Sequence, residues 1–177
     1  MKKVLIFLVA LSLAGCTSVT KPMSAKGEVI GCADVKHVAV QSGETTLTCL
    51  TGSEKISIES LRGPLIVNVW GSWCGPCADE IPLFVEFHQQ VKGKVAILGI
   101  SVEEAKPQDP KDFIVSHGIL WPNLYDAKGV TRGSFGMGVP VTWFIDQSGK
   151  VIYKHVGVIK STDELINLTA QYLKVKI

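Results

Sequence analysis

The sequence predicts an α/β layer fold, with a mixed central β-sheet covered by helices on both faces and a small β extension on its N-terminal side. Residues 65–70 form a β-branched apolar run of the kind found in strands buried on both faces. Apolar residues at helical spacing follow that run. A second strand-like run follows, and a hairpin and a last helix complete the chain. Strands that alternate with helices in this way favour a layered sheet.

The first half of the expected domain contains a buried strand and the helix that follows it. Before them, residues 29–58 alternate weakly between apolar and polar, which predicts the small β extension. The helical pattern begins at Ala78 and places Ile81 and Phe84 on one face. Pro82 lies inside the pattern, and we expect it to kink the helix.

The second half of the expected domain contains the remaining strands of the sheet and the remaining helices. Ser161 and Glu164 have the spacing of a capping box, which opens the last helix. Gly118 follows a helical pattern and is typical of a helix end. The other expected elements are a strand at residues 95–102, a helix at 111–117, a strand at 141–145, a turn at 146–149 and an antiparallel strand at 150–157.

Composition limits the function classes. The 177 residues fit one compact domain, and 46% hydrophobic with 19% charged residues excludes a disordered chain. Eighteen basic residues against sixteen acidic ones give a net charge of +2, and Lys2 and Lys3 account for that excess. A chain so near neutrality has no basic footprint for nucleic acid. We expect a monomer.

The first residues are typical of an export signal. Lys2 and Lys3 precede an apolar run of about 11 residues, which as a helix spans roughly 16 Å and is short for a membrane span. Leu13-Ala14-Gly15-Cys16 resembles the lipobox of bacterial lipoproteins, in which the cysteine is acylated. A plain signal peptide with a chance cysteine is the alternative. We expect a signal peptide at residues 1–15, a lipidated tether at 16–28 and the folded domain at 29–177.

Two cysteines stand where the first buried strand gives way to a helix, as Cys74-Gly75-Pro76-Cys77. The unpaired N–H groups at a helix N-terminus stabilise a thiolate, so the pKa of Cys74 is expected below the usual value of about 8.5. A thiolate attacks disulfides through a mixed-disulfide intermediate. Cys74 is therefore the expected nucleophile and Cys77 the resolving thiol. The redox group is the protein's own disulfide, with no separate cofactor.

A zinc site is the alternative interpretation of these cysteines. Zinc needs four ligands, generally in two closely spaced pairs. Cys32 and Cys49 are 17 positions apart, and the four histidines have no metal-ligand spacing. We therefore expect no metal.

The segment from Trp70 to Pro82, WGSWCGPCADEIP, resembles the active-site segment of thioredoxin-like proteins, and more narrowly that of the exported TlpA/ResA/DsbE group. A second match is GVPVTWFID, which begins at Gly138. The resemblance implies a thioredoxin-like fold, a cis peptide bond at Pro140 facing the disulfide, and pairing of substrate peptide with the backbone of Val139. An ordinary trans proline at the start of an edge strand is the alternative. Trp73 is expected beside Cys74, in contact with substrate or packed in the core.

The chain departs from cytoplasmic thioredoxins at Asn68, where they carry a buried aspartate. Glu80 is the candidate replacement for proton handling at Cys77, because it lies one helical turn further on. Burial would raise the pKa of its carboxyl. A solvated helix charge is the alternative interpretation.

Cys32 and Cys49 remain once Cys16 and the active-site pair are assigned. An oxidising compartment favours a disulfide between them. Closing this loop would stabilise the domain by about 3 kcal/mol. A second redox pair that relays electrons to Cys74 is the alternative.

Together these features predict a lipid-anchored thiol–disulfide oxidoreductase on the extracytoplasmic side of a bacterial membrane. The resemblance implies protein substrates, such as apocytochrome c or other exported cysteine proteins, in cytochrome c maturation or oxidative folding. A reductant would need a membrane electron donor of the CcdA or DsbD kind. The sequence leaves open whether the protein reduces or oxidises.

Two other functions are considered. A redoxin-type peroxidase would carry P-x-x-x-T-x-x-C, but the corresponding positions are Val67 and Gly71. The other alternative is a non-catalytic chaperone for haem or apocytochrome.

Overall fold

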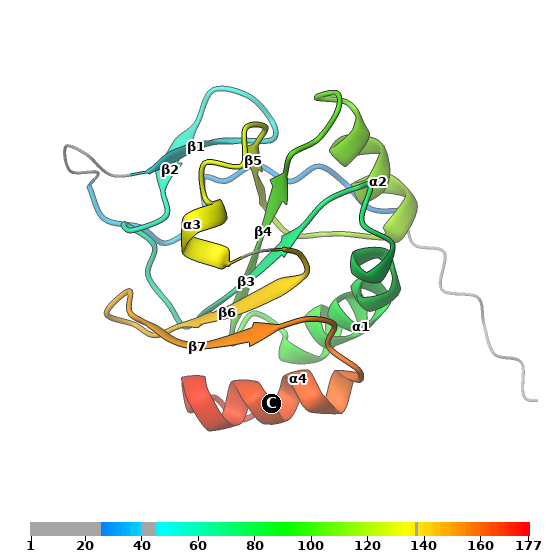
Figure 1. Cartoon of the computed structure of the whole chain (residues 1–177). Coiled ribbons are helices and arrows are strands. Elements are labelled where there is room, and N and C mark those ends of the chain that lie inside the picture. The colour runs from blue at the N-terminus through cyan, green and yellow to red at the C-terminus, as the bar shows by residue number, and fades with distance from the viewer. Residues whose placement is uncertain (1–25, 40–44, 137) are drawn as a thin grey trace, which may run out of the picture.

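A computed structural model describes residues 26–39, 45–136 and 138–177. Its seven-stranded sheet has the order β2-β1-β5-β4-β3-β6-β7 (Figure 1). The strands are β1 (Thr46–Cys49), β2 (Lys55–Ser57), β3 (Leu65–Trp70), β4 (Ala96–Val102), β5 (Asn123–Asp126), β6 (Val141–Ile145) and β7 (Val151–Val156). The helices are α1 (Gly75–Val91), α2 (Asp109–His117), α3 (Arg132–Phe135) and α4 (Thr162–Leu168), which continues as a π-helical turn (Thr169–Leu173).

The sheet is mixed, as predicted. Strands β3, β4 and β5 are parallel to one another, whereas β6, β7, β1 and β2 join by antiparallel pairing. Helix α1 connects β3 to β4 and helix α2 connects β4 to β5, and both helices lie on the same face of the sheet. The β1–β2 hairpin is the predicted N-terminal extension, and it pairs with β5 at one edge of the sheet.

Strand β3 separates two hydrophobic cores. Every residue of β3 is buried, and its side chains alternate between the faces. Val67 and Val69 belong to the core beneath the N-terminal segment, whereas Ile66 and Trp70 belong to the core beneath α1 and α4. The same alternation places Asn68 on the α1 side. One polar residue of the central strand thus points toward α1.

Two elements were not predicted. β5 has four residues, and three of them are buried without a long apolar run. α3 has four residues and contains Gly133. Both have tertiary contacts. β5 pairs in parallel with β4 and in antiparallel with β1, and in α3 the carbonyl of Ser134 accepts from Lys154 Nζ. Periodicity over a few residues gives too weak a signal for either.

Other boundaries differ by a few residues. α1 begins at Gly75 rather than Ala78, because Pro76 fits the first turn of a helix, where its missing N–H is not needed. The helix runs through Pro82 to Val91. Ser161 caps α4 as predicted, with its Oγ accepting a hydrogen bond from the Glu164 N–H at 3.0 Å.

The packed chain begins slightly before the expected boundary at Val29. The N–H groups of Gly27 and Glu28 donate to the carbonyls of Val115 and Ile119, both at 3.0 Å. A side chain at Gly27 would not fit, because its Cβ would lie 2.0 Å from the carbonyl oxygen of Ile114. The expected signal peptide, the first part of the tether and Cys16 lie outside the described residues. Among the described helices, none is long and apolar enough to span a membrane.

Candidate active site

The two sulfurs of the Cys-Gly-Pro-Cys segment form a disulfide at the first turn of α1. Cys74 is the N-cap residue, and its Sγ accepts a hydrogen bond from the Cys77 N–H at 3.2 Å. Cys77 is fully buried, whereas Cys74 retains a small exposed edge. After reduction, the same N–H and the positive end of the helix would stabilise a thiolate on Cys74. The sulfur that solvent reaches is thus also the one poised to ionise.

The segment before β6 lies against this disulfide. The peptide bond between Val139 and Pro140 is cis, as the resemblance implies. The carbonyl oxygen of Val139 is 3.8 Å from Cys74 Sγ. Within the described residues, the Val139 N–H has no hydrogen-bond partner, whereas the Pro140 carbonyl accepts from the Gly157 N–H. Antiparallel pairing of β3 with β6 brings these distant segments together.

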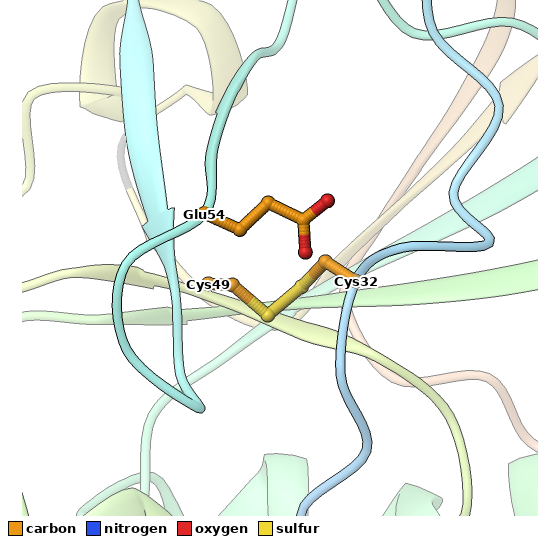
Figure 2. A group of neighbouring side chains, drawn as sticks. All are labelled: Cys32, Cys49 and Glu54. Atoms are coloured by element: carbon orange, nitrogen blue, oxygen red, sulfur yellow. A yellow bond between two sulfur atoms is a disulfide. The ribbon is translucent and has the colours of Figure 1, made fainter.

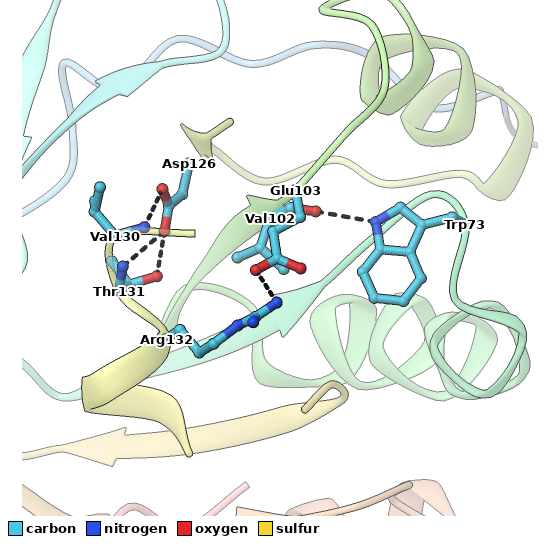
Figure 3. A network of polar contacts seen from close by, with 7 residues as sticks. All are labelled: Trp73, Val102, Glu103, Asp126, Val130, Thr131 and Arg132. Carbon is cyan, nitrogen blue, oxygen red and sulfur yellow. Dashed lines mark hydrogen bonds and ion pairs between the residues drawn. The ribbon is translucent and has the colours of Figure 1, made fainter. Parts of the chain in front are cut away.

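Trp73 forms an exposed wall beside Cys74. Its side chain is 56% exposed, and its indole N–H donates to the carbonyl of Val102 at 3.1 Å (Figure 3). The ring also covers Gly71, where a Cβ would lie 2.6 Å from indole atoms. Trp70 instead is buried in the core, where it donates to Asn123 Oδ1. Of the two tryptophans around the motif, only Trp73 can meet a substrate.

Glu80 is fully buried on α1, one turn after Cys77. Its Oε1 accepts from Asn68 Nδ2 at 2.8 Å and its Oε2 from the Ile159 N–H at 2.9 Å. Burial raises the pKa of Glu80 to about 7, and these two hydrogen bonds oppose the rise. The alternative interpretation, a solvated helix charge, is therefore wrong. A carboxyl that titrates near neutrality can take or give a proton under ordinary conditions.

Asn68 can serve both protonation states of Glu80. Its Nδ2 donates to the carboxylate, whereas its Oδ1 is buried with no partner among the described atoms. Rotation of the amide by half a turn would present Oδ1 to a protonated Glu80. An aspartate at this position would place a second negative charge beside Glu80. The asparagine therefore leaves the carboxyl of Glu80 as the titrating group of this pair.

Cys32 and Cys49 form a second disulfide, which joins the N-terminal segment to the end of β1. Both cysteines are buried. The carboxylate of Glu54 lies beside them, and the ligand atoms of the three residues lie within 4.8 Å of one another (Figure 2). The two sulfurs are bonded to each other, so this cluster has no thiolate to bind a metal.

Two acidic residues near the site were not predicted. Asp126 ends β5, and its carboxylate accepts hydrogen bonds from the N–H groups of Val130 and Thr131 (Figure 3). An aspartate just before a turn could have signalled that role. Glu104 lies beneath the loop between β3 and α1 and bonds Ser72. Its position next to Glu103 in an acidic pair gave no local signal.

The fold and the paired cysteines define a thiol–disulfide oxidoreductase with a thioredoxin-like fold, and comparisons with known proteins agree. The chain matches the AhpC/TSA family over residues 38–154, and it belongs to that family. Thiol–disulfide oxidoreductase ResA of Bacillus anthracis is 32% identical over 124 residues, covering 68% of this chain and 70% of the relative.

Two further relatives support the same class. Thioredoxin-like protein YneN of Bacillus subtilis is 28% identical over 131 residues, covering 70% of this chain and 76% of the relative. A secreted disulfide oxidoreductase of Mycobacterium tuberculosis, described as homologous to DsbE of E. coli, superposes with a TM-score of 0.63. It is 24% identical and covers 72% of this chain and 96% of its own, so this likeness concerns the fold.

Proposed function

We propose that the protein exchanges disulfides with exported proteins through Cys74 and Cys77. In the reducing direction, the Cys74 thiolate attacks one sulfur of a substrate disulfide and releases the other as a thiolate. Cys77 then attacks Cys74 Sγ, which closes the Cys74–Cys77 disulfide and releases the second substrate thiolate. Two electrons pass to the substrate, whose thiolates take up protons. The observation that carries this proposal is a disulfide at a helix N-terminus whose outer sulfur faces Val139.

Glu80 would accept the proton that Cys77 must lose before it attacks. The spacing of three positions puts both side chains on one face of α1. Both are buried, so water has little access to take the proton instead. A carboxyl with a pKa of about 7 is suited to this transfer, because it is partly ionised at neutral pH.

Val139, Pro140 and Trp73 would bind the substrate polypeptide. The Val139 N–H, which has no partner in the part of the chain that the structure describes, can pair with the backbone of an extended peptide, in the manner of a strand added to an edge. The ring of Trp73, the residue before Cys74, offers an exposed apolar face. Recognition through backbone groups and an apolar wall suits unfolded protein segments that contain cysteine.

The N-terminal sequence supports a place on the outer surface of a bacterial membrane, with Cys16 as the lipidated residue. The substrates we propose there are apocytochrome c or other exported cysteine proteins. If the protein acts as a reductant, a membrane protein of the CcdA or DsbD kind would supply its electrons. Labelling cells with radioactive palmitate tests the anchor: the wild type should incorporate label, and Cys16→Ala should not. Equal labelling of both would contradict it.

Trapping of a mixed disulfide tests the exchange mechanism. Cys77→Ser leaves Cys74 without its resolving thiol, so it should accumulate a covalent complex with substrate that reducing agent dissolves. Cys74→Ser is the matched control and should accumulate none. A non-catalytic chaperone would instead retain full activity in Cys77→Ser cells, and that result would contradict the proposal.

Membership of the AhpC/TSA family makes a peroxidase the second candidate. The threonine of the peroxidase pattern corresponds to Gly71, which has no side chain to assist peroxide cleavage. We therefore expect the reduced protein to consume hydrogen peroxide no faster than a Cys74→Ser control. Rapid peroxide consumption that requires Cys74 would support the peroxidase instead.

A further inference from the structure

The carboxylate of Glu104 is bonded to the loop that carries the active-site residues. Its Oε1 accepts from the Ser72 N–H at 2.8 Å and from the Ser101 hydroxyl at 2.7 Å. Its Oε2 accepts from the Ser72 hydroxyl. The side chain is only 7% exposed. Both oxygens of an almost buried acid are therefore used, and two of the three bonds go to one loop residue.

The turn after β4 places this glutamate beneath the loop. Glu103 has a φ of 52°, in the left-handed region that non-glycine residues rarely adopt. Its N–H donates to the carbonyl of Asp126 at 3.0 Å, and its carboxylate pairs with Arg132 (Figure 3). The chain bends there, and the Glu103 carboxylate pairs with Arg132 whereas the Glu104 carboxylate bonds Ser72. Fixed tertiary contacts thus hold the turn that aims Glu104.

A second hydrogen bond joins Trp73, the residue after Ser72, to the end of β4. The Trp73 indole donates to the Val102 carbonyl, next to the turn that carries Glu104. Ser72 and Trp73 are therefore both attached to the end of β4. Cys74 follows directly, and its N–H donates to the Gly71 carbonyl at 3.0 Å. Hydrogen bonds to ionised groups are roughly twice as strong as neutral ones, so Glu104 is the firmer of the two attachments.

We propose that Glu104 is a positioning residue for substrate binding. By holding Ser72, it keeps the exposed ring of Trp73 in the position in which it contacts a bound polypeptide next to Cys74. This inference rests on the proposed function, because Trp73 matters only if a polypeptide binds there. Glu104 touches neither sulfur. Its loss should therefore weaken the binding of a protein substrate more than the reactivity of Cys74.

Kinetics with two substrates test the proposal. For Glu104→Ala we expect KM for a disulfide-containing protein, such as insulin, to rise about tenfold, which is the usual order for a lost hydrogen bond to a charged group. The rate at which the reduced protein reacts with the small reagent dithiobis(nitrobenzoate) should change less than about twofold, since this reagent does not need to bind against Trp73. Glu104→Gln should restore most of the binding, because its amide oxygen can still accept from the Ser72 N–H. Glu103→Gln is the control on the neighbouring acid: its amide oxygen can still accept a hydrogen bond from Arg132, so the turn should be retained and both rates should stay near the wild-type values.

Fluorescence quenching gives a readout that does not depend on activity. Trp73 is 56% exposed, whereas Trp70, Trp121 and Trp143 are at most 5% exposed, so acrylamide reports mainly on Trp73. Glu104→Ala should increase its quenching constant, and Glu104→Gln should not. Ser72→Ala removes only the hydroxyl bond and should give an intermediate increase, which keeps the test available if Glu104→Ala folds poorly.

Two results would overturn the proposal: quenching and KM that are unchanged in Glu104→Ala, or an equal loss with the protein and the small reagent. A wild-type protein that neither reduces insulin nor oxidises a reduced protein that contains cysteine would contradict the proposed function instead. In that case the quenching measurement still decides whether Glu104 holds Trp73.

Discussion

At the scale of single residues, the site depends on one acid buried among hydrogen-bond donors. Glu80 is removed from water, and among the described residues its carboxylate accepts hydrogen bonds from the amide of Asn68 and the N–H of Ile159. Burial therefore dominates, and the pKa rises to about 7. The sequence could predict this candidate because a glutamate one turn after Cys77 lies on the buried face of α1. It could not supply Ile159, which comes from the segment before α4, 79 positions away.

Glu80 makes the stability of the folded protein depend on pH. Its pKa is about 7 in the folded state and 4.5 in the reference state, so the folded protein binds more protons between these values. Stability should be greatest below pH 4.5 with respect to this group and should fall as pH rises toward 7. The loss is on the order of 3 kcal/mol, at about 1.4 kcal/mol for each pKa unit.

Denaturant unfolding of the oxidised protein at pH 4 and pH 8 measures this effect. Between pH 4 and pH 8 the unfolding free energy of the wild type should fall by more than that of Glu80→Gln, because the variant has no carboxyl to titrate at this position. A difference between wild type and variant that stays constant across the range would show that Glu80 ionises normally. The pH–rate profile for disulfide exchange should also lose an inflection near pH 7 in Glu80→Gln, and an unchanged profile would contradict its role with Cys77.

At the scale of elements, α1 and α4 are joined on the face where Glu80 lies. The Thr162 hydroxyl donates to the carboxylate of Glu86 at 2.6 Å, and Ser161 caps α4 through the Glu164 N–H. Ser161→Ala should cost about 1 kcal/mol of unfolding free energy, which is typical for a lost N-cap. Thermal or denaturant unfolding measures it. Ser161→Asp is the control that retains a cap, and equal loss in both variants would contradict the capping role.

The second disulfide links the segment before β1 to the end of β1. Cys32 lies in the segment before β1 and Cys49 at the end of β1, and both are buried. Replacing both by alanine should lower the unfolding free energy by about 3 kcal/mol, as expected for a loop of this length. Disulfide exchange at Cys74 should be retained in the folded variant. A loss of exchange without a loss of stability would instead favour an electron relay through this pair.

At the scale of the whole molecule, the strand–helix order and the N-cap at Ser161 could be read from local patterns. β3 and β6 carry long apolar runs, so periodicity identified both strands. β5 and α3 could not be found this way, because each is four residues long and is held by neighbouring segments. The proximity of Val139 to Cys74 came from family resemblance, since local patterns carry no information on contacts between residues 65 positions apart.

The acids around the site show the same limit. Glu104 acts on Ser72 from 32 positions away, through a turn whose left-handed residue is a glutamate rather than a glycine. Nothing in the local pattern distinguishes Glu104 from Glu103, although one faces inward and the other pairs with Arg132. Only the folded sheet, with β3 and β4 ending side by side, separates their roles.

A redox titration with site-resolved alkylation tests the central claim, that Cys74 and Cys77 are the reactive couple. The protein is equilibrated in glutathione or dithiothreitol buffers of known potential, the free thiols are alkylated, and each cysteine is quantified by mass spectrometry. Cys74 and Cys77 should become labelled together as a two-electron couple, while Cys32 and Cys49 stay oxidised. A midpoint near ~−270 mV would identify a reductant and one near ~−120 mV an oxidant. Earlier labelling of Cys32 and Cys49, with Cys74 and Cys77 still bonded, would contradict the account.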